Sequence, residues 1–139
     1  MNNKELLNSR WGYTVSPNEL ETFDDFCTWL EAILSGPCSI SVIEDGTTFV
    51  MEQKGIVDRV KGLTIVINPK EHPPPHFHVK YSGNNVSFVI EDCSLLAGNI
   101  GNRELAIVRY WHKYSKLKLI EKWDETRPTN CTVGFIIKE

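Results

Sequence analysis

The chain has 139 residues, of which 41% are apolar, and a formal net charge of −3. A chain of this length can bury one sizeable core and is too short for two independent ones, so we expect a single domain over residues 1–139. Its longest apolar runs, such as LTIVI at 63–67, are far shorter than the roughly 20 residues of a membrane helix, so the sequence predicts no membrane span.

The N-terminus and the cysteines bear on where the protein works. The segment MNNKELLNSRW carries charges and amides where a secretory signal has an apolar stretch. The four cysteines include no C-x-x-C pair, which argues against a zinc ribbon and against a dense disulfide framework. No G-x-G-x-x-G or P-loop fingerprint is present. We therefore expect a cytoplasmic protein and no cofactor.

Residues 1–55 predict a helix followed by a hairpin. SPNELETFDDFCTWLEAILSG (16–36) has a Ser-Pro opening, early acidic residues, apolar residues at helical spacing and a final Gly36. SISVIEDGTTFVMEQ (39–53) contains two alternating runs around Asp45-Gly46. An Asp-Gly pair between alternating runs is the strongest short signal for a β-hairpin.

The middle of the chain predicts three further strands. VDRVKGLTIVINP (57–69) has a turn at Lys61-Gly62 and a strand that ends at Pro69. HFHVKY (76–81) and NNVSFVIED (84–92) follow, joined through residues 82–84, so this region should form an antiparallel meander.

The last third predicts mainly helix. NRELAIVRYWHKYSKLKLIEKWDE (102–125) has helical spacing with Asn102 as its cap, and we expect a break near Ser115 that divides it into two helices. A final strand is expected at 131–137. The sequence therefore predicts an α+β fold: a mostly antiparallel sheet of meander and hairpins, with an N-terminal helix and a C-terminal helix pair packed on one face.

Charge is unevenly distributed along the chain. Residues 1–50 hold eight acidic and two basic residues, residues 51–102 hold five of each, and residues 103–139 hold eight basic and five acidic ones. The basic end could meet phosphates, an acidic partner, or the protein's own acidic N-terminal part. The pI of 5.8 is below that of a typical dedicated nucleic-acid-binding domain.

The segment HPPPHFHV (72–79) carries the residues that most suggest a site. Because side chains alternate along a strand, His76, His78 and Lys80 should share one polar face. The opposite face should hold the core residues Phe77, Val79 and Tyr81. The same alternation is typical of any half-exposed strand, so the pattern alone does not define a function.

The three prolines limit the metal chemistry. They favour an extended polyproline backbone that places His72 roughly 12 Å along the chain from His76. Three histidines so spaced do not bind one zinc ion unless a cis proline folds the loop back. An H-x-H pair can still supply two ligands, with the others taken from Glu91, Asp92, Cys93 or His112.

Without a metal, the same histidines could act as an acid–base pair. Imidazole titrates near neutrality, so His76 and His78 could take and give protons in phosphoryl transfer. Lys80 could stabilise the charge that develops on phosphorus. These residues suit a nuclease or phosphoesterase, and they equally suit a purely structural role in which one imidazole ties the proline loop to the sheet.

The pattern PPHFHV, followed by Lys-Tyr, a second strand, a glycine-bearing connection and a helix with a tryptophan, resembles a small bacterial family known as domain of unknown function 4160. The resemblance covers roughly residues 60–125 and rests on Pro74, Pro75, His76, Phe77, His78 and Val79, and more loosely on Arg103, Trp111 and Trp123. It implies a short cytosolic protein encoded beside other small genes of toxin–antitoxin or mobile-element character. It implies no reaction, and it leaves out residues 1–55 and the strand expected at 131–137.

Two hypotheses follow. The first is a binding module in which the stiff loop and the adjoining strand recognise a protein partner encoded nearby, RNA or a small anionic ligand, because a preset loop loses little entropy on binding. Its candidate binding residues are His72, Pro74, Pro75, His76, His78, Arg103 and Arg109. The second is an enzyme that uses His76 and His78 with Lys80. The oligomeric state is not indicated by the sequence.

Overall fold

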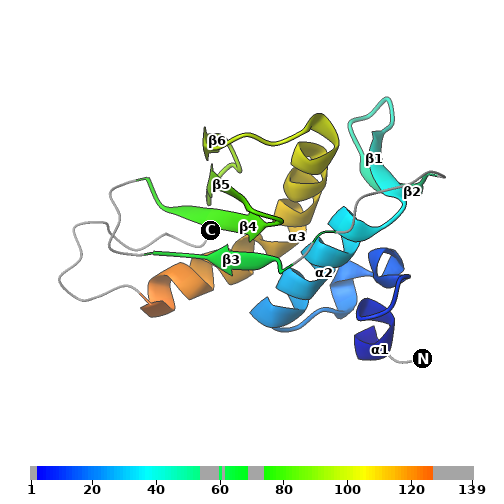
Figure 1. Cartoon of the computed structure of the whole chain (residues 1–139), viewed down its shortest axis with the longest axis horizontal. Helices are drawn as coiled ribbons and strands as arrows, with labels where there is room; N and C mark the ends of the chain where they lie inside the picture. The colour runs from blue at the N-terminus through cyan, green and yellow to red at the C-terminus, as the bar shows by residue number, and fades with distance from the viewer. Residues whose placement is uncertain (1–2, 54–59, 61, 69–73, 127–139) are drawn as a thin grey trace.

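The computed structural model describes residues 3–53, 60, 62–68 and 74–126. It confirms the α+β class, with one two-stranded and one four-stranded antiparallel sheet (Figure 1). The described elements are, in chain order, α1 (Asn3–Leu7), the 3-10 helices η1 (Gly12–Thr14) and η2 (Pro17–Glu19), α2 (Phe23–Ser35), β1 (Cys38–Val42), β2 (Thr48–Glu52), β3 (Thr64–Val66), β4 (His76–Tyr81), β5 (Asn84–Val89), β6 (Leu95–Ala97) and α3 (Asn102–Thr126). Within these residues no helix is both long and apolar enough to cross a membrane.

Helix α2 begins later than the sequence suggested. Thr22 is its N-cap: the Thr22 hydroxyl accepts from the Asp25 N–H at 3.1 Å, and the Asp25 carboxylate accepts from the Thr22 N–H at 3.3 Å. This reciprocal capping box satisfies two N–H groups of the first turn. The expected opening at Ser16-Pro17 is wrong, because Pro17 begins the separate helix η2.

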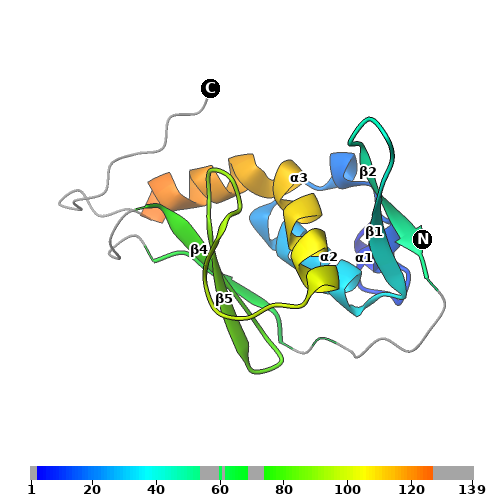
Figure 2. The same cartoon turned by 90° about the horizontal axis from the view of Figure 1, so that it is seen from above.

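The hairpin of β1 and β2 forms at the predicted place. Gly46 has a φ of +89°, which a side chain would disfavour, and the Asp45 carboxylate accepts from the Thr47 N–H at 2.8 Å. The two strands form a sheet of their own. This hairpin and the four-stranded sheet lie on opposite sides of α2 and of the first turns of α3 (Figure 1, Figure 2).

The larger sheet has the order β3-β4-β5-β6. Ser82 and Gly83 both have positive φ, at 46° and 80°, which is the backbone of a tight two-residue hairpin turn between β4 and β5. Strand β6 was not predicted. It is three residues long and pairs with β5 across an irregular register at Ser87 and Phe88, so it has no alternating pattern to reveal it.

Helix α3 is one continuous helix of 25 residues, so the predicted break and helix pair are wrong. Ser115 lies inside the helix, buried, and its hydroxyl donates to the carbonyl of Trp111 at 3.0 Å. This bond to the preceding turn satisfies the hydroxyl without breaking the helix. The turn residue Lys61, the strand end at Pro69 and the strand expected at 131–137 lie outside the described residues.

The core lies where α3 meets both the sheet and α2. Phe77 of β4 packs on Phe88 of β5 and on Trp111 of α3, with ring centroids 5.6 and 5.9 Å apart. The indole N–H of Trp111 donates to the carbonyl of Phe26 in α2 at 2.7 Å. Trp111 therefore connects α3 to α2, and Phe77 connects α3 to the sheet.

Candidate functional site

The side chains of β4 alternate between the core and the candidate site, as the sequence predicted. Phe77, Val79 and Tyr81 are buried. His76, His78 and Lys80 occupy the opposite face, and their exposure rises along the strand from buried to half-buried to exposed. We call these three side chains the histidine face.

His76 is the most enclosed member of the histidine face, with 5% of its surface exposed. Its Nδ1 lies 2.9 Å from the carbonyl oxygen of Pro74. A carbonyl only accepts, so Nδ1 carries the hydrogen, and in the neutral ring Nε2 is then the acceptor nitrogen. His76 thus fastens the proline segment to the start of the strand. The backbone of Pro75 adds to this, because its carbonyl accepts from the Ile90 N–H at 3.0 Å.

His78 lies next to His76 and closer to solvent. The two ring centroids are 5.2 Å apart, with an interplanar angle of 67°. Nδ1 of His78 lies 3.3 Å from Oδ1 of Asn85, which is on β5 directly across from Lys80. An amide oxygen accepts, so this bond orients the imidazole with Nδ1 as its donor.

The open end of the histidine face is at the β4–β5 turn. Lys80 and Asn85 are both exposed there and line a shallow hollow of about 560 Å³ with Gly62, Tyr81, Ser82, Gly83 and Asn84. Sequence reasoning missed Asn85. The signal was available, because placing the turn at Ser82-Gly83 pairs Asn85 with Lys80.

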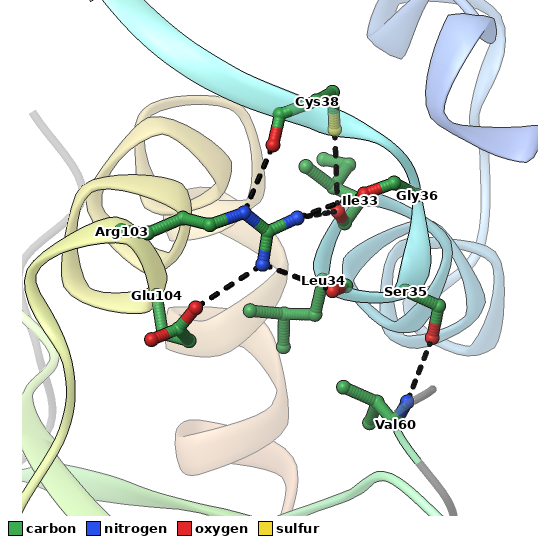
Figure 3. A network of polar contacts seen from close by, with 8 residues as sticks. All are labelled: Ile33, Leu34, Ser35, Gly36, Cys38, Val60, Arg103 and Glu104. Carbon is green, nitrogen blue, oxygen red and sulfur yellow. Dashed lines mark hydrogen bonds and ion pairs between the residues drawn. The ribbon is translucent and has the colours of Figure 1, made fainter. Parts of the chain in front are cut away.

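The other predicted site residues are not brought to the histidine face as a group. Pro74 is exposed and Pro75 half-buried beside it, whereas His72 lies outside the described residues. Arg109 is exposed on α3. Arg103 belongs to α3, and its side chain reaches the C-terminal end of α2. There its guanidinium donates to backbone carbonyls (Figure 3).

A metal site is not assembled in the part of the chain that the structure describes. No group of three or more histidine, cysteine, aspartate or glutamate side chains is placed to hold an ion there. His112, one of the expected extra donors, stacks on Phe77 with centroids 6.4 Å apart, so it lies on the core side of β4, opposite His76 and His78. The H-x-H pair would need further ligands from elsewhere to make a zinc site.

His112 is a buried histidine with a structural bond. Its Nε2 donates to the carbonyl of Ile90 at 2.6 Å. Burial lowers the pKa of His112 from its ordinary value of 6.5, and Lys116 acts in the same direction, while the bond to Ile90 and the charge of Asp92 oppose the shift. The neutral ring is therefore the form that the fold favours.

This shift predicts a pH dependence of stability. Because the pKa is lower in the folded than in the unfolded protein, the stability contributed by neutral His112 is full above pH 6.5 and is lost as the pH falls through the folded value. In urea titrations between about pH 7.5 and 5, we expect the wild type to lose more stability than His112→Gln, which keeps a donor but does not titrate. Equal losses in the two proteins would contradict this account.

Comparison with known proteins confirms the resemblance drawn from PPHFHV. The model of a family described as Domain of unknown function (DUF4160) matches residues 62–124. The match spans the four-stranded sheet and nearly all of α3, and leaves out α1, α2 and the β1–β2 hairpin. No curated protein and no solved structure matches the chain.

Proposed function

We propose that the protein is a small binding module of a toxin–antitoxin or defence-like gene pair. On this proposal the histidine face receives an acidic side chain of a protein partner encoded nearby. The observation that carries the proposal is the gradient of exposure along β4: His76 is 5% exposed and bonded to Pro74, while His78 and then Lys80 approach solvent.

The chemistry of this gradient suits recognition of an anion. Lys80 offers three N–H donors on an ammonium group, and His78 offers an imidazole N–H. Bonds between charged donors and a carboxylate are short and about twice as strong as neutral ones. The anchor at His76 and Pro74 presets the neighbouring backbone, so little conformational entropy is lost when a partner binds.

The enzymatic alternative is supported less well. A nuclease needs both members of an acid–base pair within hydrogen-bond reach of a bulky substrate. His76 is buried and its Nδ1 is bonded to a backbone carbonyl, so it is poorly placed to exchange protons with RNA. His78 and Lys80 alone provide one imidazole and one amine, which is closer to a binding site than to a catalytic pair of histidines.

The proposal predicts a binding defect without a folding defect. We expect the protein encoded by the adjacent small gene to co-elute with the wild type, and the double change His78→Ala with Lys80→Ala to weaken the complex by about tenfold or more, since each charge-assisted hydrogen bond is worth about 1.5–3 kcal/mol. The matched control is Lys4→Ala, which removes an exposed lysine on α1. Affinity is measured by calorimetry, and a thermal melt of each variant checks the fold.

A growth assay separates this proposal from the enzyme. The wild type and the double variant are expressed in a bacterial host, with and without the neighbouring protein, and total RNA is followed. RNA loss that requires His78 would overturn the binding proposal in favour of a nuclease. Intact RNA, together with a complex that depends on His78 and Lys80, would support it.

A further inference from the structure

A second cavity lies away from the histidine face and almost wholly outside the family match. It has a volume of about 480 Å³ and is formed by the segment after α1, by α2, by β2 and by α3. Its lining residues include four aromatic side chains, Trp11, Tyr13, Trp29 and Tyr110. Pockets for small ligands have volumes of roughly 300–1,000 Å³, so this space suits a compact molecule.

The cavity has a buried floor and an exposed rim. Tyr13 and Trp29 are 4% and 1% exposed, whereas Trp11 is 42% exposed and Glu52 is also exposed. The rings of Trp11 and Tyr13 are 6.3 Å apart between centroids, and those of Trp29 and Tyr110 are 6.0 Å apart. Neither pair is stacked face to face: the interplanar angles are 42° and 56°. The four rings therefore form walls of the cavity that are tilted relative to one another.

The charge of the lining is negative. Among the described residues that line the cavity, Glu52 is the acidic one and none is a lysine or an arginine. The hydroxyl of Tyr13 donates to Oε1 of Glu52 at 2.9 Å. Burial and the bond to Glu52 raise the pKa of Tyr13, so Tyr13 stays a neutral phenol and orients the carboxylate. Aromatic faces beside a carboxylate attract cations.

Two rings of this cavity already attract cations of the chain. The guanidinium carbon of Arg10 lies 4.8 Å from the centroid of Trp11, and Nζ of Lys113 lies 5.4 Å from that of Tyr110. Arg10 and Lys113 do not line the cavity. These contacts are consistent with ring faces that favour positive charge, since tryptophan and tyrosine are the strongest aromatic partners of a cation.

Trp29, which lines the floor of the cavity, carries an unsatisfied donor that is buried behind the cavity surface. Nε1 of Trp29 is buried and has no hydrogen-bond partner among the described residues. A buried N–H without an acceptor costs free energy, and such groups are rare in folded proteins. By contrast, the indole of Trp111 in the neighbouring helix is satisfied by the carbonyl of Phe26. No solvent reaches this N–H, so a molecule in the cavity meets the ring of Trp29 and not its donor.

We propose that this cavity binds a small organic ammonium ion. The ammonium group lies against the aromatic walls and the Glu52 carboxylate. The site belongs to the acidic N-terminal part of the chain, and its occupancy does not depend on the partner proposed for the histidine face.

Three probes of similar size test whether the site requires a cation. Choline and tetramethylammonium carry the charge, and dimethylbutanol is the isostere of choline in which carbon replaces the charged nitrogen. We expect choline and tetramethylammonium to bind more tightly than dimethylbutanol, measured by calorimetry on the full chain. Equal binding of choline and dimethylbutanol would overturn the cation site, and no binding of choline at millimolar concentrations would mean that the cavity holds water only.

Variants test the two assigned contacts. Glu52→Gln keeps the bond to Tyr13 and should weaken choline binding by up to about fivefold, the range of an ion pair at an exposed carboxylate. Trp29→Phe keeps a ring that attracts cations less strongly, and it should weaken the binding of choline and of tetramethylammonium alike. Matched controls are Glu44→Gln and Phe49→Ala, which change exposed hairpin residues that do not line the cavity. If Glu52→Gln and Glu44→Gln bind choline equally, the assignment of Glu52 is wrong.

Discussion

Phe77→Ala is expected to lower the free energy of unfolding by about 3–5 kcal/mol, the range for deletion of a buried aromatic side chain. Phe77 has no exposed surface and contacts rings from two elements besides its own, Phe88 in β5 and Trp111 and His112 in α3. The change would leave a cavity where the sheet meets α3, because the surrounding residues relax only in part. Equilibrium denaturation in urea measures the loss.

The matched control for this change is Phe49→Ala. Phe49 lies on the β1–β2 hairpin with 38% of its surface exposed, so its truncation should cost much less than that of Phe77. Phe77→Leu, which keeps most of the apolar volume, should fall between the two. A loss for Phe77→Ala as small as that for Phe49→Ala would mean that the sheet is not held on α3 by this side chain.

The strand of Phe77 also shows which features of the structure could be predicted from the sequence. Strand alternation alone placed Phe77, Val79 and Tyr81 in the core and His76, His78 and Lys80 opposite them, and the structure confirms this division. Exposure along the histidine face was not predictable, because it depends on what lies beside each position and not on the alternation. Nothing in the sequence distinguished His76 from His78, whereas in the structure His76 is bonded to Pro74 and His78 to Asn85.

Local signals succeeded where chemistry within a few residues decides the conformation. The turns at Asp45-Gly46 and Ser82-Gly83 form with positive φ at Gly46, Ser82 and Gly83, a conformation that glycine adopts readily. The wrong expectations concern features that local sequence decides poorly. Ser115 looked like a helix break, but its hydroxyl is satisfied within α3 and packing maintains the helix. Pro17 looked like a helix start, but the capping box at Thr22 lies directly before Phe23, the first apolar residue of α2.

Gly36 was correctly expected to end α2, although for a different reason. A helix-ending glycine commonly adopts a left-handed conformation that satisfies the last carbonyls, yet Gly36 has a φ of −81°. A side chain at this position would lie 2.7 Å from Cδ1 of Tyr13, so the glycine is required for close packing. The carbonyls of Ile33, Leu34 and the C-cap Gly36 instead accept from Arg103, from a position 67 to 70 residues away in the chain. No local pattern reveals such a role, and Arg103 was therefore expected to bind a ligand.

Arg103 should accordingly prove to be a structural residue of large effect. Its guanidinium donates to the carbonyls of Gly36 at 2.8 Å, Cys38 at 2.9 Å, Leu34 at 3.2 Å and Ile33 at 3.4 Å. It also forms an ion pair with Glu104 at 3.1 Å (Figure 3). Guanidinium offers five donors in a fixed plane, which is why one side chain can serve several carbonyls at once.

Arg103→Ala is expected to lower the free energy of unfolding by about 2–4 kcal/mol, because it leaves partly buried carbonyls without donors and removes charge-assisted bonds. Arg103→Lys should recover only part of this loss, since an ammonium group does not reproduce the planar fork. Arg109→Ala on the same helix is the control, and this exposed residue should change stability by less than about 0.5 kcal/mol. Denaturation followed by far-UV circular dichroism and by tryptophan fluorescence gives the values.

The same experiment tests whether residues 1–139 form one domain. Arg103 lies in the family-matched region and its bonds end on residues 33–38 outside that region, so the two parts share one network. If they fold as one unit, the two probes should give coincident transitions in the wild type and in Arg103→Ala, shifted together to lower denaturant. Separate transitions in the wild type would show two folding units. Coincident transitions with no shift in Arg103→Ala would show that the carbonyls of α2 are satisfied without this arginine.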